Sequence, residues 1–466
     1  MDRAVASFTP EDVIAATAAE VRGVPGADVF ESVSTDSRTL EPGALFVALE
    51  GERFDGHVFL AAAAARGAAA AIVRRGKALP GAPLGLGLFA VDDTLRALGA
   101  LARFHRRRFQ LPLGAVGGSN GKTTTKEMAG SILGVAGAAL KTEGNLNNEV
   151  GVPLTLLRLT KEHRAAVVEL GMNAAGEMGR LVALAEPDAG LLTTIQPEHL
   201  EGLGSLAGVA AAEGELFLGL APTATAVVNL DEPLVVEQAK GARARWLTFG
   251  RDAGADVRLE ETRPLGRNGQ EVRLRADGRT VRVPLAFLGA HNALNAAAAF
   301  ALARALGLSV DACATGLAQA RPTARRLTVV EGQGGLTVLD DCYNANPASV
   351  AAALETAREL AGTGRVVAVL GDMLELGAEE AEAHARISEV AAGLAAVRAF
   401  LGPRSAAVPP ARETGEAARF VEVEALWAWL KPRLQPGDVV LVKGSRGMRM
   451  ERLVERLTGV AASAGH

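Results

Sequence analysis

The segment Gly118-Ser119-Asn120-Gly121-Lys122-Thr123-Thr124 is the most informative stretch of this sequence. It follows a strand-like apolar run, 113–117, and precedes a helical stretch, 125–133. Glycines let backbone N–H groups face phosphate oxygens at a helix N-terminus, a lysine adds charge toward the β- and γ-phosphates, and a threonine hydroxyl suits Mg²⁺. The segment therefore predicts an ATP phosphate loop. The full Walker pattern has glycine where Val116 stands, so the match is to the shorter GxxGKT form.

The sequence around this loop alternates strands with helices. Between residues 111 and 228, apolar runs such as AAVVEL (165–170) and ATAVVN (224–229) are separated by helical stretches, which predicts a mostly parallel sheet covered on both faces. Residues 255–288 alternate charged and apolar residues between turn signals, which predicts an antiparallel insertion. Four further strand-like runs, each followed by helical sequence, predict a second parallel domain after Thr328.

We expect an α/β fold of three domains, because 466 residues exceed what one hydrophobic core usually supports. The predicted domains are a small N-terminal αβ substrate domain (1–88), a central, mostly parallel P-loop ATPase domain (89–321) and a C-terminal Rossmann-like αβ domain (322–466). The Pro/Gly-rich stretch LPGAPLGLG (79–87) is the predicted linker at the first boundary.

The composition excludes several classes of protein. The 49 Lys+Arg nearly balance the 53 Asp+Glu, so the net charge of -4 indicates neither a nucleic-acid nor a membrane surface. Cys313 and Cys342 lie far apart without a CxxC pair, which argues against a disulfide framework and a zinc site. The stretch 1–20 lacks the basic start and apolar core of a signal peptide, and no apolar run is long enough to span a bilayer. We expect a cytoplasmic monomer.

Polar side chains follow two strands of the predicted sheet. Glu169 ends one strand and His199 lies just past the end of another. Ligands of open αβ sheets bind beyond the carboxyl ends of the strands, so we expect both residues to serve one or two metal ions at the nucleotide phosphates. The segment TEGNLNNEVGVP (142–153) holds Asn145, Asn147 and Asn148, whose amides suit a polar substrate or magnesium-bound water. A turn is the alternative reading of these asparagines.

Several motifs occur together in one order: GGSNGKTT (117–124), GNLNNEVGVP (144–153), VELGMNAAGE (168–177), EHLEGLGSLAGV (198–209), GAHNALNAAAA (289–299), DDCYNANPAS (340–349) and LGDMLELG (370–377). Together with STDSR (34–38), they make the chain resemble the Mur ligase family over nearly its whole length. GNLNN followed by DDCYNANP is the specific part of the resemblance. The GKT loop and HNxxN also occur in folylpolyglutamate synthases and identify only the superfamily.

The resemblance implies ATP- and Mg²⁺-dependent ligation of D-alanyl-D-alanine to UDP-N-acetylmuramoyl-tripeptide through an acyl phosphate, in cell-wall precursor synthesis. A family member that adds the third amino acid is disfavoured, because its usual DYAHTP-like stretch is replaced by DDCYNANP. A folylpolyglutamate-type synthase is disfavoured by the STDSR unit. A regulatory nucleotide-binding module without ligase activity is disfavoured because Lys122 and Glu169 are both present.

The resemblance also implies roles for individual residues. The predicted catalytic residues are Lys122, Glu169, His199 and Arg326. The nucleotide would further contact the phosphate loop (Gly118, Ser119, Asn120, Gly121, Lys122, Thr123 and Thr124), the adenine-side residues Asn292 and Asn295, and Asp341 near the ribose. The predicted substrate contacts are Ser37, Arg38 and His57 for the UDP part, Asn145, Asn147 and Asn148, and the third-domain residues Tyr343, Asn344 and Asn346. The predicted metal ligands are Thr123, Glu169, His199 and Glu213.

Two positions depart from the family pattern. Glu213 stands where the family often has a lysine that is carbamylated into a carboxylate. A glutamate is already anionic at neutral pH with an ordinary pKa, so we expect Glu213 to support magnesium without carbon dioxide. A solvated helix residue is the alternative. Arg325 replaces the glycine that the family favours before the ATP-facing arginine, which leaves open whether Arg325 or Arg326 points inward.

Overall fold

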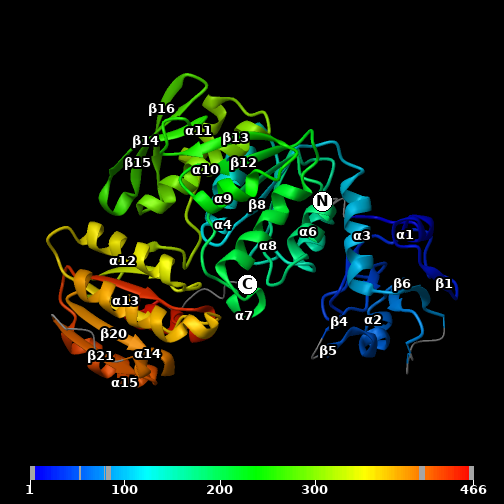
Figure 1. Cartoon of the computed structure of the whole chain (residues 1–466). Helices are drawn as coiled ribbons and strands as arrows, with labels where there is room; N and C mark the ends of the chain where they lie inside the picture. The colour runs from blue at the N-terminus through cyan, green and yellow to red at the C-terminus, as the bar shows by residue number, and fades with distance from the viewer. Residues whose placement is uncertain (1–5, 52–53, 78, 80–84, 409–414, 461–466) are drawn as a thin grey trace.

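The computed structural model describes residues 6–51, 54–77, 79, 85–408 and 415–460. Three α/β domains follow one another along the chain, and the middle domain lies between the other two (Figure 1). The predicted fold class is thereby confirmed. Residues 80–84 of the predicted linker lie outside the described residues.

The first domain is built on a five-stranded sheet in the order β1-β7-β6-β3-β2, in which β1 is antiparallel to β7 and the other neighbours are parallel. Its elements are α1 (Pro10–Thr17), β1 (Glu20–Arg22), β2 (Val33–Ser34), β3 (Leu45–Val47), β4 (Glu50–Gly51), β5 (Phe54–Asp55), η1 (Gly56–Phe59), α2 (Leu60–Ala65), β6 (Ala70–Arg74) and β7 (Gly87–Val91).

The predicted boundary after residue 88 is wrong, because it falls inside β7, which belongs to this first sheet. Gly87 gave the misleading signal, since it ends a Pro/Gly-rich stretch. A Cβ on Gly87 would lie 2.5 Å from the Cα of Pro25. This glycine therefore allows the segment after β1 to pack closely against β7, and it is not part of a flexible linker.

The middle domain carries a nine-stranded sheet in the order β16-β15-β14-β13-β12-β11-β8-β10-β9. Its elements are α3 (Thr94–Arg106), β8 (Leu113–Gly117), α4 (Lys122–Leu133), η2 (Gly134–Ala136), β9 (Ala139–Lys141), α5 (Gly151–Leu156), β10 (Ala165–Glu169), α6 (Glu177–Ala185), β11 (Ala189–Leu192), α7 (Leu200–Leu203), α8 (Leu206–Gly219), β12 (Thr225–Asn229), α9 (Pro233–Ala239), β13 (Arg245–Gly250), β14 (Val257–Pro264), η3 (Gly266–Asn268), β15 (Gln270–Ala276), β16 (Arg279–Leu285), α10 (Ala290–Ala305) and α11 (Val310–Gln319).

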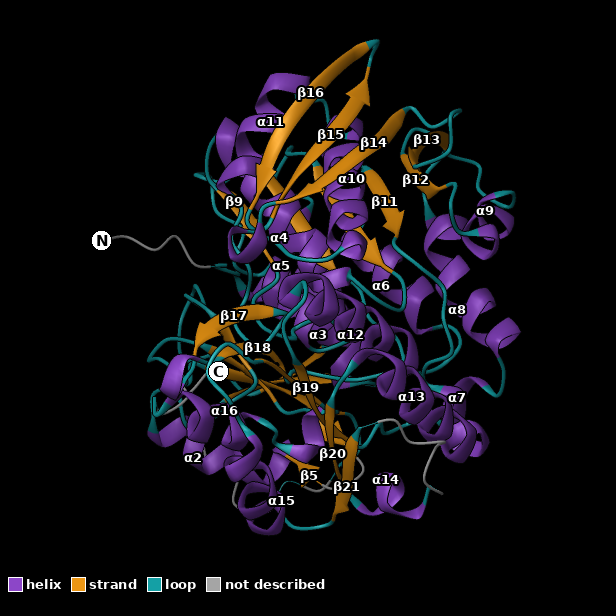
Figure 2. Ribbon diagram, turned by 90° about the vertical axis from the view of Figure 1, so that its left-hand side faces the viewer, coloured by secondary structure: helices purple, strands orange, loops and turns teal. Residues whose placement is uncertain are grey.

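The sheet is parallel from β9 to β14, and β15 and β16 extend it as antiparallel strands. Figure 2 shows β14, β15 and β16 side by side at the top of the molecule. Successive side chains of β8 enter different cores: Ala115 packs with residues of α6 and α8, and Val116 with residues of α4 and α10. The prediction that helices cover both faces of the sheet is confirmed, and so is the predicted antiparallel insertion.

The third domain carries a six-stranded sheet in the order β17-β18-β22-β19-β20-β21, in which β17 is an antiparallel edge strand. Its elements are β17 (Thr328–Glu331), η4 (Gln333–Gly335), β18 (Thr337–Asp341), α12 (Pro347–Ala361), β19 (Val366–Gly371), η5 (Gly377–Glu379), α13 (Glu380–Leu394), β20 (Val397–Leu401), α14 (Pro403–Ala407), β21 (Glu416–Phe420), α15 (Val423–Leu430), η6 (Lys431–Arg433), β22 (Val439–Lys443), η7 (Arg446–Met448) and α16 (Glu451–Thr458).

The four predicted strands of the third domain are β18, β19, β20 and β22, and the predicted boundary at 321/322 falls between α11 and β17. Within the described ranges, no helix has the length and apolar character needed to cross a membrane.

Candidate active site

The phosphate loop joins β8 to α4, and two of its glycines are required by its shape. Gly118 has φ 107° and Gly121 has φ 86°, values that side-chain-bearing residues rarely adopt. A Cβ on Gly118 would lie 2.4 Å from Thr193 Oγ1, and one on Gly121 would lie 2.4 Å from Asn295 Oδ1. Any side chain at either position would therefore distort the loop.

The segment after β11 holds the loop from one side. The Ser119 N–H donates to the Thr194 carbonyl over 2.7 Å, and the Asn120 N–H donates to Thr194 Oγ1 over 3.2 Å. Ser119 Oγ also accepts from the Gln196 N–H at 2.8 Å. This support was not predicted from the sequence, because it links residues far apart in the chain.

Lys122 begins α4, and its ammonium group folds back onto the loop, donating to the Gly118 carbonyl and, over 3.3 Å, to the Ser119 carbonyl. Burial disfavours the charged form of this lysine. The nearby carboxylates, first Glu198 and then Glu213, outweigh burial and raise the pKa of Lys122 above its ordinary value. Lys122 is therefore charged at neutral pH. Thr123 is buried beside it and Thr124 is half-buried.

Glu169 ends β10 and is buried, with 3% of its surface exposed. Asn147 Nδ2 donates to Glu169 Oε1 over 2.9 Å, and the Glu169 N–H donates to Thr142 Oγ1 over 2.9 Å. Asn147 thus orients the predicted metal-binding carboxylate. The structure brings the GNLNN segment to the phosphate site through this one asparagine.

Three buried polar atoms around the phosphate loop have no hydrogen-bond partner among the described residues: Glu169 Oε2, Glu198 Oε1 and Asn120 Nδ2. Glu198 Oε1 lies 3.7 Å from Lys122 Nζ. Buried polar atoms are normally paired, so such a group indicates a ligand site. Two carboxylate oxygens and one amide beside a lysine suit a magnesium-bound phosphate chain.

His199 precedes α7 in a left-handed conformation, with φ 51°. Its Nδ1 lies 3.3 Å from Glu375 Oε2 of the third domain. The structure therefore places this predicted metal ligand at the contact between two domains, and its metal role stays a prediction.

Glu213 lies on α8 beneath the loop and is 1% exposed, so the alternative of a solvated helix residue is wrong. Its Oε2 accepts from the Gly118 N–H over 2.8 Å. Burial raises the pKa of Glu213 to about 7, although the charge of Lys122 pulls it down. The expectation of an ordinary carboxylate pKa is therefore also wrong, because it ignored desolvation.

The two adjacent arginines of the third domain take different directions. Arg325, with φ 64°, points to Glu451 of α16, and its Nη1 lies 3.8 Å from that carboxylate. Arg326 lies over the ring of Tyr343, with its Cζ 3.9 Å from the ring centroid. The charge of Arg326 also acts on Lys122 and lowers its pKa. Arg326 therefore lies on the side of the phosphate loop, and its contact with the ATP phosphates stays a prediction.

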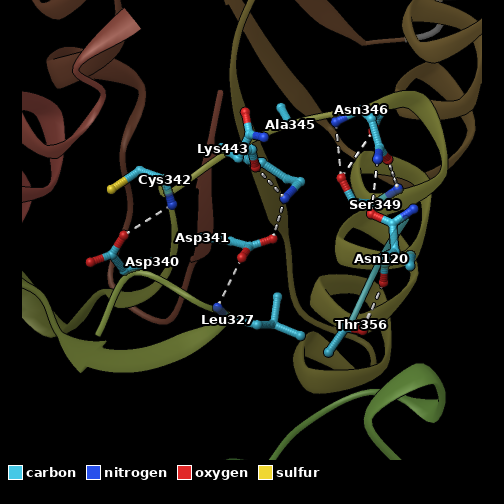
Figure 3. A network of polar contacts seen from close by, with 12 residues as sticks. Asn120, Leu327, Asp340, Asp341, Cys342, Ala345, Asn346, Ser349, Thr356 and Lys443 are labelled. Atoms are coloured by element: carbon cyan, nitrogen blue, oxygen red, sulfur yellow. Dashed lines mark hydrogen bonds and ion pairs between the residues drawn. The ribbon is translucent and has the colours of Figure 1, made fainter. Parts of the chain in front are cut away.

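Asp341 ends β18 and is held from two sides (Figure 3). Its Oδ1 accepts from the Leu327 N–H over 3.0 Å, and its Oδ2 accepts from Lys443 Nζ over 2.6 Å. Leu327 directly follows Arg326 in the sequence. Asp341 therefore helps to position Arg326, and its predicted contact with the ribose stays a prediction.

One hydrogen bond joins the third domain directly to the phosphate loop. Asn346 Nδ2 donates to Asn120 Oδ1 over 2.8 Å (Figure 3). Asn346 also caps α12, since its Oδ1 accepts from the Ser349 N–H over 2.9 Å. Asn344 is exposed next to it. The structure thus brings the predicted substrate loop to the predicted ATP loop.

Asn292 and Asn295 of α10 are buried and bonded to each other, with Asn295 Nδ2 donating to Asn292 Oδ1 over 3.0 Å. Asn292 Nδ2 donates to the Leu288 carbonyl. Because Asn295 touches Gly121, the structure places this pair against the phosphate loop. Contact with adenine stays a prediction.

Among the described residues, no hydrogen bond joins Asn145 or Asn148 to the phosphate loop or to Glu169. Asn148 Oδ1 accepts from the Gly151 N–H over 2.9 Å at the start of α5. This contact agrees with the alternative reading of the asparagines as turn residues. Asn145 is exposed.

In the first domain, Ser37 is buried, and Arg38 is exposed and paired with Asp36 at 2.7 Å. His57 is 4% exposed and has both ring nitrogens engaged: Nδ1 lies 2.6 Å from Asp55 Oδ1, and Nε2 accepts from the Arg74 N–H over 2.9 Å. His57 has no free ring nitrogen for the UDP part, so its geometry supports a structural role. The sequence did not reveal these partners.

The predicted metal ligands do not form a compact cage. In the described part of the chain, no three His, Cys, Asp or Glu side chains group closely enough to hold a metal ion by themselves. Mg²⁺ usually takes one or two carboxylates together with substrate phosphates and water. The unpaired Glu169 Oε2 and the buried Thr123 of the phosphate loop fit that pattern.

Sequence reasoning missed three residues of this site. Glu198 lies beside Lys122, Lys443 pairs with Asp341, and the guanidinium of Arg446 lies over Tyr343 with its Cζ 5.1 Å from the ring centroid. The run KGSRG (443–447), directly after the apolar strand DVVLV, was an available signal.

Comparisons with known proteins agree with this architecture. Three family models match: the Mur ligase family catalytic domain at residues 29–106, the Mur ligase middle domain at 116–303, and the Mur ligase glutamate ligase domain at 325–446. The UDP-N-acetylmuramoyl-tripeptide--D-alanyl-D-alanine ligase of Escherichia coli (strain K12) is 41% identical over 440 residues, covering 93% of this chain and 95% of its own length.

Two crystal structures resemble more than nine-tenths of the chain. MurF from Acinetobacter baumannii is 32% identical with a TM-score of 0.89, and the match covers 98% of this chain and 100% of that one. The MurF ligase of Thermotoga maritima in complex with ADP is 29% identical with a TM-score of 0.81, covering 91% and 96% of the two chains. This chain belongs to the Mur ligase family.

Proposed function

We propose that this chain joins D-alanyl-D-alanine to UDP-N-acetylmuramoyl-tripeptide in peptidoglycan precursor synthesis, converting ATP to ADP and phosphate. A carboxylate and an amine do not condense unaided in water. The γ-phosphoryl group of ATP therefore first moves to the terminal carboxylate of the tripeptide and gives an acyl phosphate. The amine of the dipeptide then attacks the acyl carbon, loses a proton and expels phosphate, which completes the amide bond.

Lys122 and Arg326 supply positive charge to the transferring phosphoryl group. Little covalent chemistry is asked of the protein in such a transfer, so positioning and charge stabilisation provide most of the rate. The two cations come from the middle and third domains, and the reaction therefore requires these domains to meet. Their contact also keeps water from the acyl phosphate, which would otherwise hydrolyse.

Thr123 and Glu169 are the residues that we propose to hold magnesium with the ATP phosphates, and Asn147 orients Glu169. Bound Mg²⁺ neutralises charge on the β- and γ-phosphates. His199 and Glu213 remain proposed contributors to the metal site. Glu213 also supports the phosphate loop, because it accepts a hydrogen bond from the Gly118 N–H.

The observation that carries this proposal is the hydrogen bond between Asn346 and Asn120. It joins the DDCYNANP loop, the specific part of the family resemblance, to the loop that binds ATP. A phosphate loop alone would equally suit many ATPases. The DDCYNANP loop (340–347) at the same site favours a ligase.

Purified protein given ATP, UDP-N-acetylmuramoyl-tripeptide and D-alanyl-D-alanine tests the proposal. Phosphate release is expected only with all three substrates, and mass spectrometry should detect the pentapeptide. Release with the tripeptide and a free amino acid, or with folate and glutamate, would support one of the rival ligases. ATP binding without amide formation would support a regulatory module.

We also propose a cytoplasmic location, which the use of ATP and the two free, buried cysteines support. The proposed site draws its catalytic groups from domains of one chain, which supports a monomer.

A further inference from the structure

Tyr343 is the only tyrosine of the sequence, and two arginines lie over its ring. The Cζ of Arg326 is 3.9 Å from the ring centroid, and that of Arg446 is 5.1 Å away. Cation–π contact holds both guanidinium groups in place. Arg326 lies on the side of the phosphate loop, but the proposed reaction leaves Arg446 without a role. Arg446 is exposed, and among the described residues no carboxylate pairs with it.

The segment that carries Arg446 is firmly joined to the loop that carries Tyr343. Lys443 Nζ donates to Asp341 Oδ2 over 2.6 Å and to the Asn344 carbonyl over 2.9 Å. Ser445 Oγ, directly before Arg446, donates to the Ala345 carbonyl over 3.3 Å. Arg446 is thus a positioned cation with no anionic partner in the described part of the chain, next to the loop 341–346.

The chemistry of the reaction identifies an anion for it. The phosphates of ATP and the carboxylate that becomes the acyl phosphate both belong beside Lys122 and Arg326. The dipeptide brings a single anionic group of its own, its C-terminal carboxylate, which lies close to the attacking amine. Arginine is the side chain best suited to a carboxylate, because its planar fork can donate two parallel hydrogen bonds.

The dimensions agree with this assignment. Both guanidinium carbons lie over one ring, so they are at most about 9 Å apart. A dipeptide spans roughly 7 Å from its amine to its carboxylate. A dipeptide whose amine lies at the Arg326 side, where the acyl phosphate forms, therefore has the length to present its carboxylate to Arg446.

We propose that Arg446, held by Tyr343, binds the C-terminal carboxylate of D-alanyl-D-alanine and so sets the position of the attacking amine. The inference rests on the proposed function and names a residue that selects the dipeptide. It predicts that the enzyme distinguishes the dipeptide from its C-terminal amide, which has the same amine and shape but lacks the negative charge.

Steady-state kinetics of the full chain with D-alanyl-D-alanine and with D-alanyl-D-alaninamide test the proposal. In the wild type, the KM for the amide should exceed that for the dipeptide by about 10- to 100-fold, as expected for one charge-assisted contact. Arg446→Gln should raise the KM for the dipeptide by a similar factor and remove the difference between the two compounds. The KM values for ATP and for the tripeptide should not change.

Arg449→Gln is the matched control, because Arg449 is an exposed arginine just beyond η7 and is absent from the Tyr343 contacts. Tyr343→Phe keeps an aromatic ring and should retain discrimination, whereas Tyr343→Ala should lose it. An Arg446→Gln enzyme that still prefers the dipeptide over the amide overturns the proposal, as does a rise in the tripeptide KM alone. Wild-type protein that forms no pentapeptide would instead overturn the proposed function.

Discussion

The phosphate loop and the third-domain loop 341–346 meet at one site, but they are assembled in different ways. The phosphate loop carries its glycines, its lysine and its threonines within one contiguous segment. The third-domain loop depends on distant partners: Asp341 is held by Lys443, which lies 102 positions later, and Tyr343 lies against Arg326 and Arg446. The phosphate loop is thus encoded locally, whereas the third-domain loop is assembled by the fold.

The largest expected effect is at the phosphate loop. Lys122→Ala should lower turnover by about 10³-fold, because it removes a positive charge that stabilises the transferring phosphoryl group. Folding should persist, since the lysine contacts the loop rather than a hydrophobic core. Phosphate release measures turnover, and circular dichroism reports the fold. Lys240→Ala, at an exposed lysine at the end of α9, is the control. Near wild-type turnover of Lys122→Ala would show that the loop has been wrongly assigned.

The same difference explains which parts of the molecule could be predicted from the sequence. Short-range patterns in the sequence predicted three features correctly: the GxxGKT loop, the strand that ends at Glu169, and the antiparallel insertion. The partners of His57 and the direction of Arg325 follow from contacts between distant residues, which no local pattern records. The burial of Glu213 also depends on packing. Polar and apolar residues of α8 are not separated onto opposite faces of the helix, so the sequence does not show which side of the helix is buried. The boundary near Gly87 failed because composition does not distinguish a packing glycine from a linker glycine.

The third-domain loop should depend strongly on its buried ion pair. Asp341→Ala leaves Lys443, which is 3% exposed, without its counter-charge, and removing one partner of such a pair costs about 4 kcal/mol of stability. The KM for ATP should also rise more than that for the tripeptide, since Asp341 positions the segment next to Arg326. Urea unfolding followed by the fluorescence of Trp427 and Trp429, both in the third domain, measures the stability.

Replacing both partners distinguishes the ion pair from a simple packing defect. The double variant Asp341→Ala with Lys443→Met should recover most of the lost stability, because no unpaired charge remains buried. A double variant as unstable as Asp341→Ala would mean that the ion pair does not account for the loss.

The carboxylate beneath the phosphate loop should make stability depend on pH. The pKa of Glu213 is raised from 4.5 to about 7 in the fold, so the folded protein binds the proton more tightly than the unfolded chain does. Its contribution to stability is fully present below pH 4.5 and is lost as the pH rises through about 7. Glu213→Gln carries no such titration. In metal-free buffer, the stability of the wild type relative to this variant should therefore fall by on the order of 3 kcal/mol across that range.

The same variant tests whether Glu213 supports magnesium. The magnesium concentration that gives half-maximal turnover should rise about tenfold in Glu213→Gln, because a metal-supporting carboxylate has lost its charge. Wild-type turnover should not respond to bicarbonate, since no carbamylated lysine is involved. An unchanged magnesium dependence would exclude the metal role and leave Glu213 as a support of the Gly118 N–H.

The smallest expected effect is at the hydrogen bond that joins the two loops. Asn120→Ala removes the acceptor of the Asn346 amide, and a single neutral hydrogen bond contributes about 1 kcal/mol, or roughly a fivefold rise in the KM for ATP. Asn346→Ser removes the donor but keeps a residue able to cap α12, so that helix stability does not confound the result. If both single variants raise the KM for ATP by breaking this one hydrogen bond, the KM of the double variant should be no higher than that of either single variant, because the second substitution has no bond left to break. Multiplied effects would instead mean that Asn120 and Asn346 act independently on ATP, and that the two loops meet without being coupled.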